Sequence, residues 1–305
     1  MKSTTRFRRE DKLKSAIITG ATGFIGSHLC RFLVDNDWRV LIIARPSSDY
    51  AIIGDVADKV EIYEHDGDIA NLIRYFSDNA VDVVFHLASL CIIEHEPKDI
   101  DGLIECNIRF GLHLLEAMGR SRNKLLINTG TSWQHYNSME YCPVNLYSAT
   151  KKAYEDLIRY YSEAQQIRVI TLKLFDTYGE SDNRPKLINL LHKFADENSM
   201  LRLSAGEQFL DLVHVSDVVR AFMAAFALLD SNETITFDEY AVASGREINL
   251  KELIGIFESV TNKSVNVCWG GKGYRKREVM KLWNSYRLLP NWECKVSLEE
   301  GLKKF

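Results

Sequence analysis

The segment Gly20-Ala21-Thr22-Gly23-Phe24-Ile25-Gly26 restricts the fold of this chain more than any other feature. It separates a short apolar run, residues 16–19, from residues 24–36, whose apolar side chains recur at helical spacing. Glycines between a strand and a helix allow a tight turn and a close approach to the backbone, and the helix N-terminus offers unpaired N–H groups to an anion. This pattern predicts a βα turn that binds the pyrophosphate of a dinucleotide, although a turn without a ligand is the alternative. The residues of the turn assigned to cofactor binding are Gly20, Thr22, Gly23, Phe24, Ile25 and Gly26.

The next 150 residues continue the alternation of apolar runs and helical patterns. Strands are expected at 40–43, 60–63, 81–87, 125–127 and 169–174, and helices at 69–76, 100–118 and 147–165. Strands that are apolar on both faces and alternate with helices indicate a parallel sheet covered on both sides. The predicted fold is therefore α/β, a Rossmann-type doubly wound parallel sheet.

After about residue 175 the elements become shorter and more widely separated. Helices are expected at 185–194, 215–229, 248–260 and 298–304, extended segments at 210–214 and 265–269, and a strand at 234–242. We predict a dinucleotide-binding domain over 15–180 that the chain re-enters at 213–245. The smaller C-terminal substrate-binding lobe would comprise 181–212 and 246–305, and residues 1–14 would form an N-terminal arm.

Composition excludes several other classes of protein. A formal net charge of −4 is too balanced for a chain whose main task is coating nucleic acid, and no apolar run approaches the ~20 residues that cross a bilayer. The basic N-terminus has no apolar segment typical of a secretory signal. The six cysteines form no CxxC pair, so we expect buried, reduced thiols and a cytoplasmic protein. No metal site is expected, because Glu94-His95-Glu96 lacks the spacing of known metal motifs.

The end of the second predicted strand bears on the choice of cofactor. Enzymes that prefer NAD usually place a carboxylate there, which binds the ribose hydroxyls. Here Ala44 and Arg45 occupy that place, and the first carboxylate is Asp49. An arginine can pair with a 2′-phosphate, so we expect NADPH, with NADH as the second possibility and a solvated Arg45 as the alternative.

A second acidic position follows the third predicted strand. Asp68 and Ile69 close the segment Asp66-Gly67-Asp68-Ile69. A carboxylate here could accept a hydrogen bond from the adenine amino group. It could also cap the helix that begins at Ile69, and the two roles are compatible.

Tyr147 and Lys151 open the helix after the fifth predicted strand, with a spacing of four that places them on one face. An ammonium group near a phenol favours the phenolate, so we expect Lys151 to lower the pKa of Tyr147 and make it a proton donor or acceptor near neutrality. The fifth strand ends in Thr131, Ser132 and Trp133. We assign Thr131, Tyr147 and Lys151 to catalysis on a carbonyl and Ser132 and Trp133 to substrate contact, while hydroxyls that merely cap the strand end are the alternative.

With these residues in place, the chain resembles the extended short-chain dehydrogenase/reductase family of nucleotide-sugar epimerases, dehydratases and reductases. The matching segments are GATGFIG at 20–26, DGDI at 66–69, HLAS at 86–89, Asn107, Thr131, YSATK at 147–151, FDTYG at 175–179, LDLVHVSDV at 210–218 and RKRE at 275–278. The phrases NTGTSWQHY, TLKLFDTYG and RPKLINLL are most similar to the sugar-nucleotide 4-ketoreductase branch, such as CDP-paratose and CDP-abequose synthases.

The resemblance implies further site residues and one departure. Additional cofactor contacts would be Leu87, Ala88, Asn107 and Phe175, with Tyr147 and Lys151 also touching the cofactor. Substrate contacts would be Ser89, Asp176, Arg184, Lys186 and Arg277, of which Arg184 and Lys186 could equally be plain surface charges. Relatives carry an arginine that binds the substrate diphosphate where this chain has Leu210, so an arginine contact is not expected at that position.

The expected activity is NADPH-dependent reduction of the C4 keto group of a nucleotide-diphospho-4-keto-6-deoxy or dideoxy sugar, in deoxysugar biosynthesis for O-antigen and lipopolysaccharide. An NAD-dependent nucleotide-sugar 4-epimerase is the main alternative. A non-catalytic dinucleotide sensor on the same fold and a 4,6-dehydratase fit less well, the latter because no acid lies beside Thr131. By analogy with the family, we expect a homodimer formed through helices 100–118 and 147–165.

Overall fold

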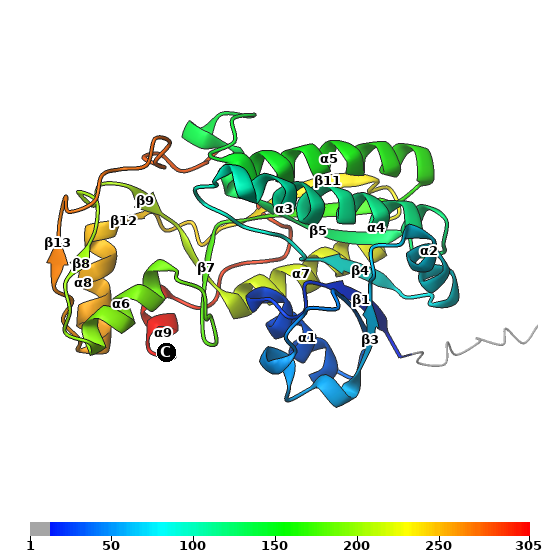
Figure 1. The fold of residues 1–305 in the computed structure, drawn as a ribbon, viewed down its shortest axis with the longest axis horizontal. Coiled ribbons are helices and arrows are strands. Elements are labelled where there is room, and N and C mark those ends of the chain that lie inside the picture. The colour runs from blue at the N-terminus through cyan, green and yellow to red at the C-terminus, as the bar shows by residue number, and fades with distance from the viewer. Residues whose placement is uncertain (1–12) are drawn as a thin grey trace, which may run out of the picture.

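A single sheet of seven parallel strands organises most of the molecule (Figure 1). The computed structural model describes residues 13–305, so most of the predicted arm, residues 1–12, lies outside the described residues. In spatial order the strands are β11 (Phe237–Val242), β6 (Arg168–Leu174), β5 (Leu125–Thr131), β4 (Val83–His86), β1 (Ser15–Thr19), β2 (Arg39–Ala44) and β3 (Val60–Glu64). The order reverses between β1 and β4, which confirms the predicted doubly wound Rossmann-type sheet.

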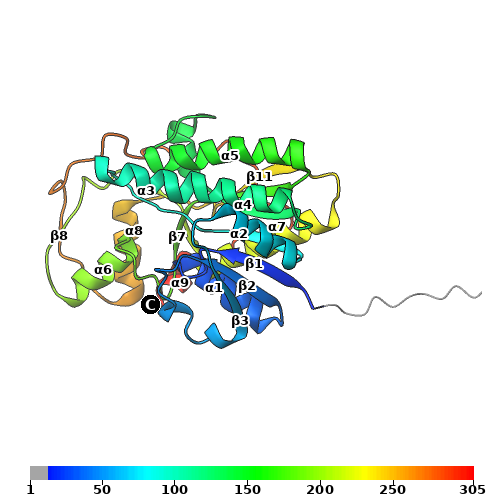
Figure 2. The same ribbon diagram turned by 45° about the vertical axis from the view of Figure 1, so that its right-hand side comes forward.

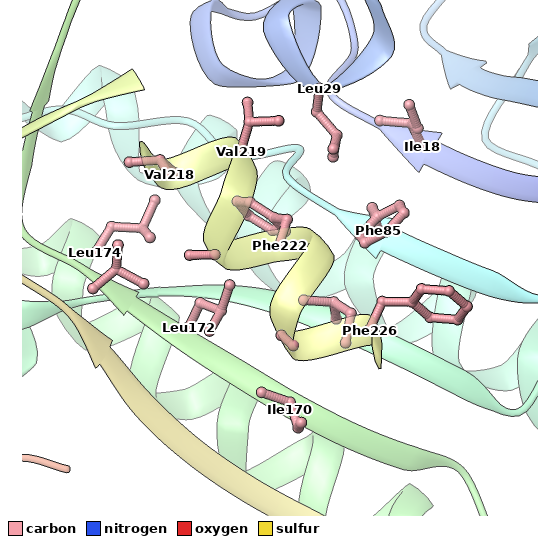
Figure 3. Packing of buried hydrophobic residues seen from close by; sticks show 14 of the residues in the cluster. Ile18, Leu29, Phe85, Ile170, Leu172, Leu174, Val218, Val219, Phe222 and Phe226 are labelled. Carbon is pink, nitrogen blue, oxygen red and sulfur yellow. The ribbon is translucent and has the colours of Figure 1, made fainter. Parts of the chain in front are cut away.

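Helices cover both faces of this sheet, because its central strands are apolar on both sides. Successive residues of β1 point to opposite faces, so Ile17 and Ile18 belong to two different cores. The helices α2 (Ile69–Asp78), α4 (Phe110–Gly119) and α5 (Leu146–Gln165) pack on the Ile17 side. The other side is covered by α1 (Phe24–Asp35) and α7 (Val215–Ser231), whose Phe222 packs against Phe85 (Figure 3).

The predicted helix at 100–118 has the expected extent but a different geometry. It consists of α3 (Ile100–Ile104), a π-helical turn (Glu105–Arg109) and α4. The π-helical turn contains Asn107, whose side chain is buried and fully hydrogen-bonded to the loop after β4 and to α5. A π-helical turn inside a helix often marks a functional site, and here it lies next to the candidate catalytic residues.

A second, smaller core forms beside the carboxyl ends of the strands (Figure 2). Its helices are α6 (Leu187–Asp196), α8 (Leu250–Thr261) and α9 (Leu298–Leu302). Three two-stranded pairs accompany them: β7 (Asp176–Tyr178) with β10 (Leu212–His214), β9 (Phe209–Leu210) with β12 (Ile248–Asn249), and β8 (Leu201–Arg202) with β13 (Val267–Cys268). Apart from Tyr178, the fully buried apolar residues of this core come from 188–201 and 248–302.

The C-terminal aromatic residues divide between core and surface: Trp283, Tyr286 and Trp292 pack on the core of the main sheet, while Trp269 and Tyr274 are exposed. One expectation from the sequence, that the cysteines are buried, needs correction. The cysteines are free, but only Cys30 is buried, and Cys91 is exposed. Apolar neighbours in sequence do not bury a residue when the surrounding segment is a loop. Across residues 13–305, no helix is both long and apolar enough to cross a membrane.

Candidate active site

A cleft of about 680 Å³ lies between the carboxyl ends of the strands and the smaller core. Its floor comes from the loops after β1, β4 and β5, which meet where the strand order reverses. Its opposite wall comes from the segment between β7 and α6 and from residues 272–283. The cleft is therefore where the parallel sheet places ligands in this fold.

The glycine turn makes one end of this cleft. Gly20 has a positive φ of 75°, and a Cβ there would lie 2.6 Å from the Ala88 amide nitrogen. A Cβ at Gly26 would collide with the Gly20 carbonyl. Helix α1 begins at Phe24 without a side-chain cap, so its first N–H groups and dipole face the turn. The space and the free donors fit a dinucleotide pyrophosphate.

The predicted adenosine contacts lie at the ends of β2 and β3. Arg45 is exposed, and its backbone N–H donates to Ser48 Oγ at 3.1 Å, which shapes the turn. Within residues 13–305 its guanidinium makes no ion pair or hydrogen bond. Asp68 caps α2 by accepting from the Ala70 N–H at 2.7 Å, so the capping role is present. Its contact with adenine stays a prediction.

The three predicted catalytic residues come from two adjoining elements. Thr131, at the end of β5, has its backbone N–H bound to Gln134 Oε1 at 3.0 Å, and its hydroxyl oxygen accepts from the Trp133 N–H at 3.3 Å. Tyr147 opens α5, which Asn145 caps through the Ser148 N–H at 3.0 Å. Thr131 and Tyr147 both line the cleft, with Ser89 and Ser132 near them, whereas Lys151 is buried behind them.

The pKa of Tyr147 is shifted in the direction opposite to our expectation. Burial raises the pKa of Tyr147, and the Ser89 hydroxyl opposes this only in part through a hydrogen bond. Burial lowers the pKa of Lys151 to about 8. The predicted lowering of the Tyr147 pKa by Lys151 is therefore wrong for this conformation, because desolvation of the phenolate dominates and the cation that opposes it is Arg184. At neutral pH Tyr147 is a phenol, which is the form that donates a proton.

The side chain of Asn107 is hydrogen-bonded to other residues of the protein. Its side-chain oxygen accepts from Ser89 Oγ at 3.1 Å and from the Leu90 N–H at 2.8 Å. Its amide nitrogen donates to the Leu90 carbonyl at 3.0 Å and to Thr150 Oγ1 at 2.9 Å. All four hydrogen-bonding positions of this side chain are used within the protein, and the contact of Asn107 with the cofactor stays a prediction. Asn107 fixes the loop after β4 to α5, and with it Ser89 beside Tyr147.

The remaining predicted cofactor contacts are apolar or backbone groups. Leu87 and Phe175 line the cleft, as do Phe24 and Ile25. The ring of Phe175 is buried and lies parallel to that of Trp283 at 6.3 Å. The Ala88 N–H donates to Thr19 Oγ1 at 3.2 Å, which holds this loop against the glycine turn.

The wall opposite the catalytic residues is cationic and aromatic. The Trp133 ring has Lys186 Nζ 5.9 Å from its centroid and the Arg275 guanidinium at 5.6 Å. Arg184 is paired with Asp182 at 2.7 Å, and its guanidinium lies 4.7 Å from the Phe24 ring centroid.

Asp176 faces the same three cations. Burial raises its pKa, and Lys186, Arg275 and Arg184 act in the opposite direction. An acid among three cations can stay ionised and accept a hydrogen bond, while the cations suit a diphosphate.

Arg277 does not line this cleft, contrary to the assignment from the sequence. Its guanidinium lies over the Tyr136 ring at 4.4 Å and contacts the Cys142 thiol at 2.8 Å. Arg275 points into the cleft in its place. Both belong to the RKRE segment, which has no regular structure, so spacing could not tell which side chain turns inward. Leu210 lines the cleft with an apolar side chain.

Comparison with known proteins places the chain among enzymes of similar fold. It is 26% identical to the CDP-abequose synthase of Salmonella muenchen over 297 residues, which cover 96% of this chain and 97% of that protein. The structure is similar to UDP-glucose 4-epimerase from Thermotoga maritima with UDP-glucose, with a TM-score of 0.81, 23% identity and coverage of 95% and 96%. A UDP-glucose 4-epimerase from Stenotrophomonas maltophila, with bound NAD, gives a TM-score of 0.84 at 20% identity, with the same coverage.

The family model that matches this chain spans residues 16–242. The match includes the glycine turn, Thr131, Tyr147 and Lys151, and it ends with the last strand of the sheet. The chain therefore belongs to the NAD dependent epimerase/dehydratase family.

Proposed function

We propose that this protein is an NADPH-dependent reductase that converts the C4 keto group of a nucleotide-diphospho-4-keto-6-deoxy or dideoxy sugar to an alcohol. The reaction would take place in the cytoplasm and serve the biosynthesis of deoxysugars for surface polysaccharide. Similarity to CDP-abequose synthase along nearly the whole chain supports this choice within the family.

The end of β2 is the observation that carries the proposal. Ala44 closes the strand, and Arg45 follows where enzymes that prefer NAD place a carboxylate. The exposed guanidinium is available for the 2′-phosphate of NADPH. A reductase exchanges its cofactor at every turnover, whereas an epimerase holds it. A site that distinguishes NADPH from NADH by an ion pair at the protein surface favours exchange of the cofactor.

The cleft residues supply the protein's part of the reaction. When bound, NADPH provides the hydride that reaches C4. Tyr147, kept protonated by its buried position, donates the proton to the carbonyl oxygen. Thr131 donates a hydrogen bond to the same oxygen, since its own oxygen is already oriented by the Trp133 N–H. The Lys151 ammonium stabilises the phenolate that the proton transfer leaves.

The opposite wall would hold the nucleotide sugar. Lys186, Arg275 and Arg184 bind the diphosphate, in place of the arginine that relatives carry at the position of Leu210. Asp176 accepts a hydrogen bond from a sugar hydroxyl. Ser89, Ser132 and Trp133 complete the sugar pocket. We also propose a homodimer formed through the helices at 100–119 and 146–165.

Purified protein incubated with NADPH and a panel of CDP-, dTDP-, GDP- and UDP-4-keto sugars tests this function. We expect NADPH oxidation with at least one sugar, and protein that purifies largely without cofactor. The epimerase alternative takes its place if the protein retains stoichiometric NAD through purification and interconverts 4-hydroxy sugars with no added cofactor.

A further inference from the structure

A cluster of buried charged side chains lies next to the end of β5, which carries Thr131. Lys173, the penultimate residue of β6, is 0% exposed. Its ammonium lies 3.6 Å from Glu155 Oε2, 3.2 Å from Glu239 Oε2 and 2.9 Å from His135 Nε2. Glu155 is also 0% exposed. Fully buried charges are rare unless paired, because removing each ion from water costs several kcal/mol.

His135 contributes no charge to this cluster. Its Nδ1 lies 3.1 Å from the Met139 carbonyl, which can only accept, so Nδ1 carries the proton and Nε2 accepts from Lys173. Burial lowers the pKa of His135 to about 4, so the ring is neutral. The ring is stacked on Trp283 at 4.0 Å, which fixes its orientation. The carboxylates of Glu155 and Glu239 therefore balance the Lys173 charge without a contribution from His135.

Glu155 also lies near the catalytic residues. It follows Lys151 by one turn of α5. A Cβ at Gly130 would lie 3.2 Å from Glu155 Oε1 and 3.1 Å from Gln134 Oε1. Gln134 in turn holds the backbone of Thr131. The carboxylate thus lies beside the end of β5, and on α5 it is one turn away from Lys151.

Glu155 is the carboxylate that favours the charged form of the buried Lys151. The other titratable groups around Lys151 are Tyr147 on the same helix, His86 at the end of β4, Cys91 in the following loop and Cys106 in the π-helical turn. Each of them is neutral near pH 7: desolvation raises the pKa of the phenol and of both thiols, although Cys91 is partly open to solvent, and burial lowers the pKa of His86 to about 3.

We propose that Glu155 and Lys173 are positioning residues for Lys151. Lys173 holds the Glu155 carboxylate ionised beneath the start of α5, and Glu155 keeps the Lys151 ammonium charged and in place. The inference rests on the proposed function in one respect: Lys151 must be cationic for Tyr147 to give up its proton.

Direct titration of Lys151 tests the proposal without any sugar substrate. The side-chain ¹⁵N resonance of Lys151, assigned with Lys151→Arg, is followed by NMR against pH in the full-length protein. In the unaltered protein we expect the ammonium to lose its proton near pH 8. In Glu155→Gln the midpoint moves to lower pH by about one unit, because burial then acts unopposed.

Three further variants separate positioning from a purely structural role. Lys173→Met leaves the buried Glu155 carboxylate with only the partly exposed Lys152 as its partner, so we expect Glu155 to take up a proton and both the Tm and the Lys151 midpoint to fall. The double variant Glu155→Gln/Lys173→Met removes both charges and regains most of the Tm, but its Lys151 midpoint stays low. Lys173→Arg keeps the cation and the midpoint. The control, Lys152→Gln, removes the partly exposed partner of Glu155 and leaves the midpoint nearly unchanged.

The double variant decides the question even if the single variants do not fold. A Lys151 midpoint that matches the unaltered protein in that variant overturns the proposal, and a lowered midpoint supports it. The alkaline limb of the kcat profile should move in parallel wherever a 4-keto sugar is reduced. If no such sugar is reduced but the midpoint shifts as described, the proposed function fails and the positioning role stands.

Discussion

The two walls of the cleft are lined by different kinds of chemical group. The sheet side consists of backbone and small residues: Gly20 leaves no room for a Cβ against Ala88, and α1 presents bare N–H groups. The lobe side contributes long charged side chains, and two of them, Lys186 and Arg275, lie against Trp133 of the loop after β5. The pyrophosphate is the same in every nicotinamide dinucleotide, so steric and backbone contacts suffice for it, and only the 2′-phosphate needs a side chain such as Arg45. A sugar nucleotide varies, and side chains supply the selectivity.

Substitutions in the two walls should therefore have different effects on ligand binding. Changes near Thr131 and Tyr147, where the two walls meet, should impair turnover. Changes in the lobe wall should impair sugar binding without altering cofactor affinity, and changes at Arg45 should do the reverse. A change that affects both ligands equally would show that the two walls are not independent.

The largest effect is expected at the junction of the walls. Tyr147→Phe removes the proton donor and keeps the ring, so kcat should fall by about 10²–10⁴ while NADPH binding persists. Stopped-flow NADPH oxidation and fluorescence titration measure the two quantities. Tyr160→Phe is the matched control, since Tyr160 lies on the same helix and is 62% exposed. More than about half the activity left in Tyr147→Phe would identify another group as the acid.

The lobe wall is tested by two arginines from one segment. Arg275→Ala removes a cation from the cleft, so kcat/KM for the sugar nucleotide should fall about 10- to 100-fold, mostly through KM, with NADPH affinity retained. Arg277→Ala is the control, because that side chain lies over the ring of Tyr136 and does not itself line the cleft. A larger loss of substrate affinity in Arg277→Ala would favour Arg277 as the substrate contact, as the sequence pattern predicts.

The difference between the walls also explains what could be predicted. The glycine turn, Tyr147 and Lys151 are fixed by short-range spacing on a strand, a turn and a helix, so the sequence indicated them. Arg275 lies in an irregular segment whose path depends on the packing of Trp283 on the main sheet. No local sequence pattern predicts the path of this segment.

The buried cluster could not be predicted for a similar reason. Lys173 interrupts the apolar run of its strand, which is the one signal that the sequence offers. Its partners Glu155 and Glu239 come from a helix and a strand that meet it only in the folded protein. The π-helical turn at Asn107 likewise depends on hydrogen bonds to residues distant in sequence.

The sheet wall is tested at its rim. A charge-assisted pair between Arg45 and the 2′-phosphate contributes about 1.5–3 kcal/mol, so Arg45→Asp should shift preference towards NADH by roughly one to two powers of ten. Kd values for NADH and NADPH measure this shift. The control, Arg122→Asp, changes an equally exposed arginine before the amino end of β5. Equal affinities for the two cofactors in the unaltered protein would contradict the assignment.

The smallest effect is expected at the second donor to the reacting oxygen. Thr131→Val removes one neutral hydrogen bond, worth about 0.5–1.5 kcal/mol, so kcat should fall roughly 2- to 12-fold. The Kd values for NADPH and the sugar nucleotide should stay unchanged. A decrease as large as that in Tyr147→Phe would show that Thr131 does more than donate a hydrogen bond.

The fate of the hydride tests the central claim most directly. Incubation with NADPH that carries deuterium at the transferred position, followed by NMR and mass spectrometry of the product, should place one deuterium at C4. About one NADPH should be consumed for each sugar converted. Conversion of a 4-hydroxy sugar to its epimer without net NADPH consumption and without deuterium in the product would contradict the reductase and establish the epimerase.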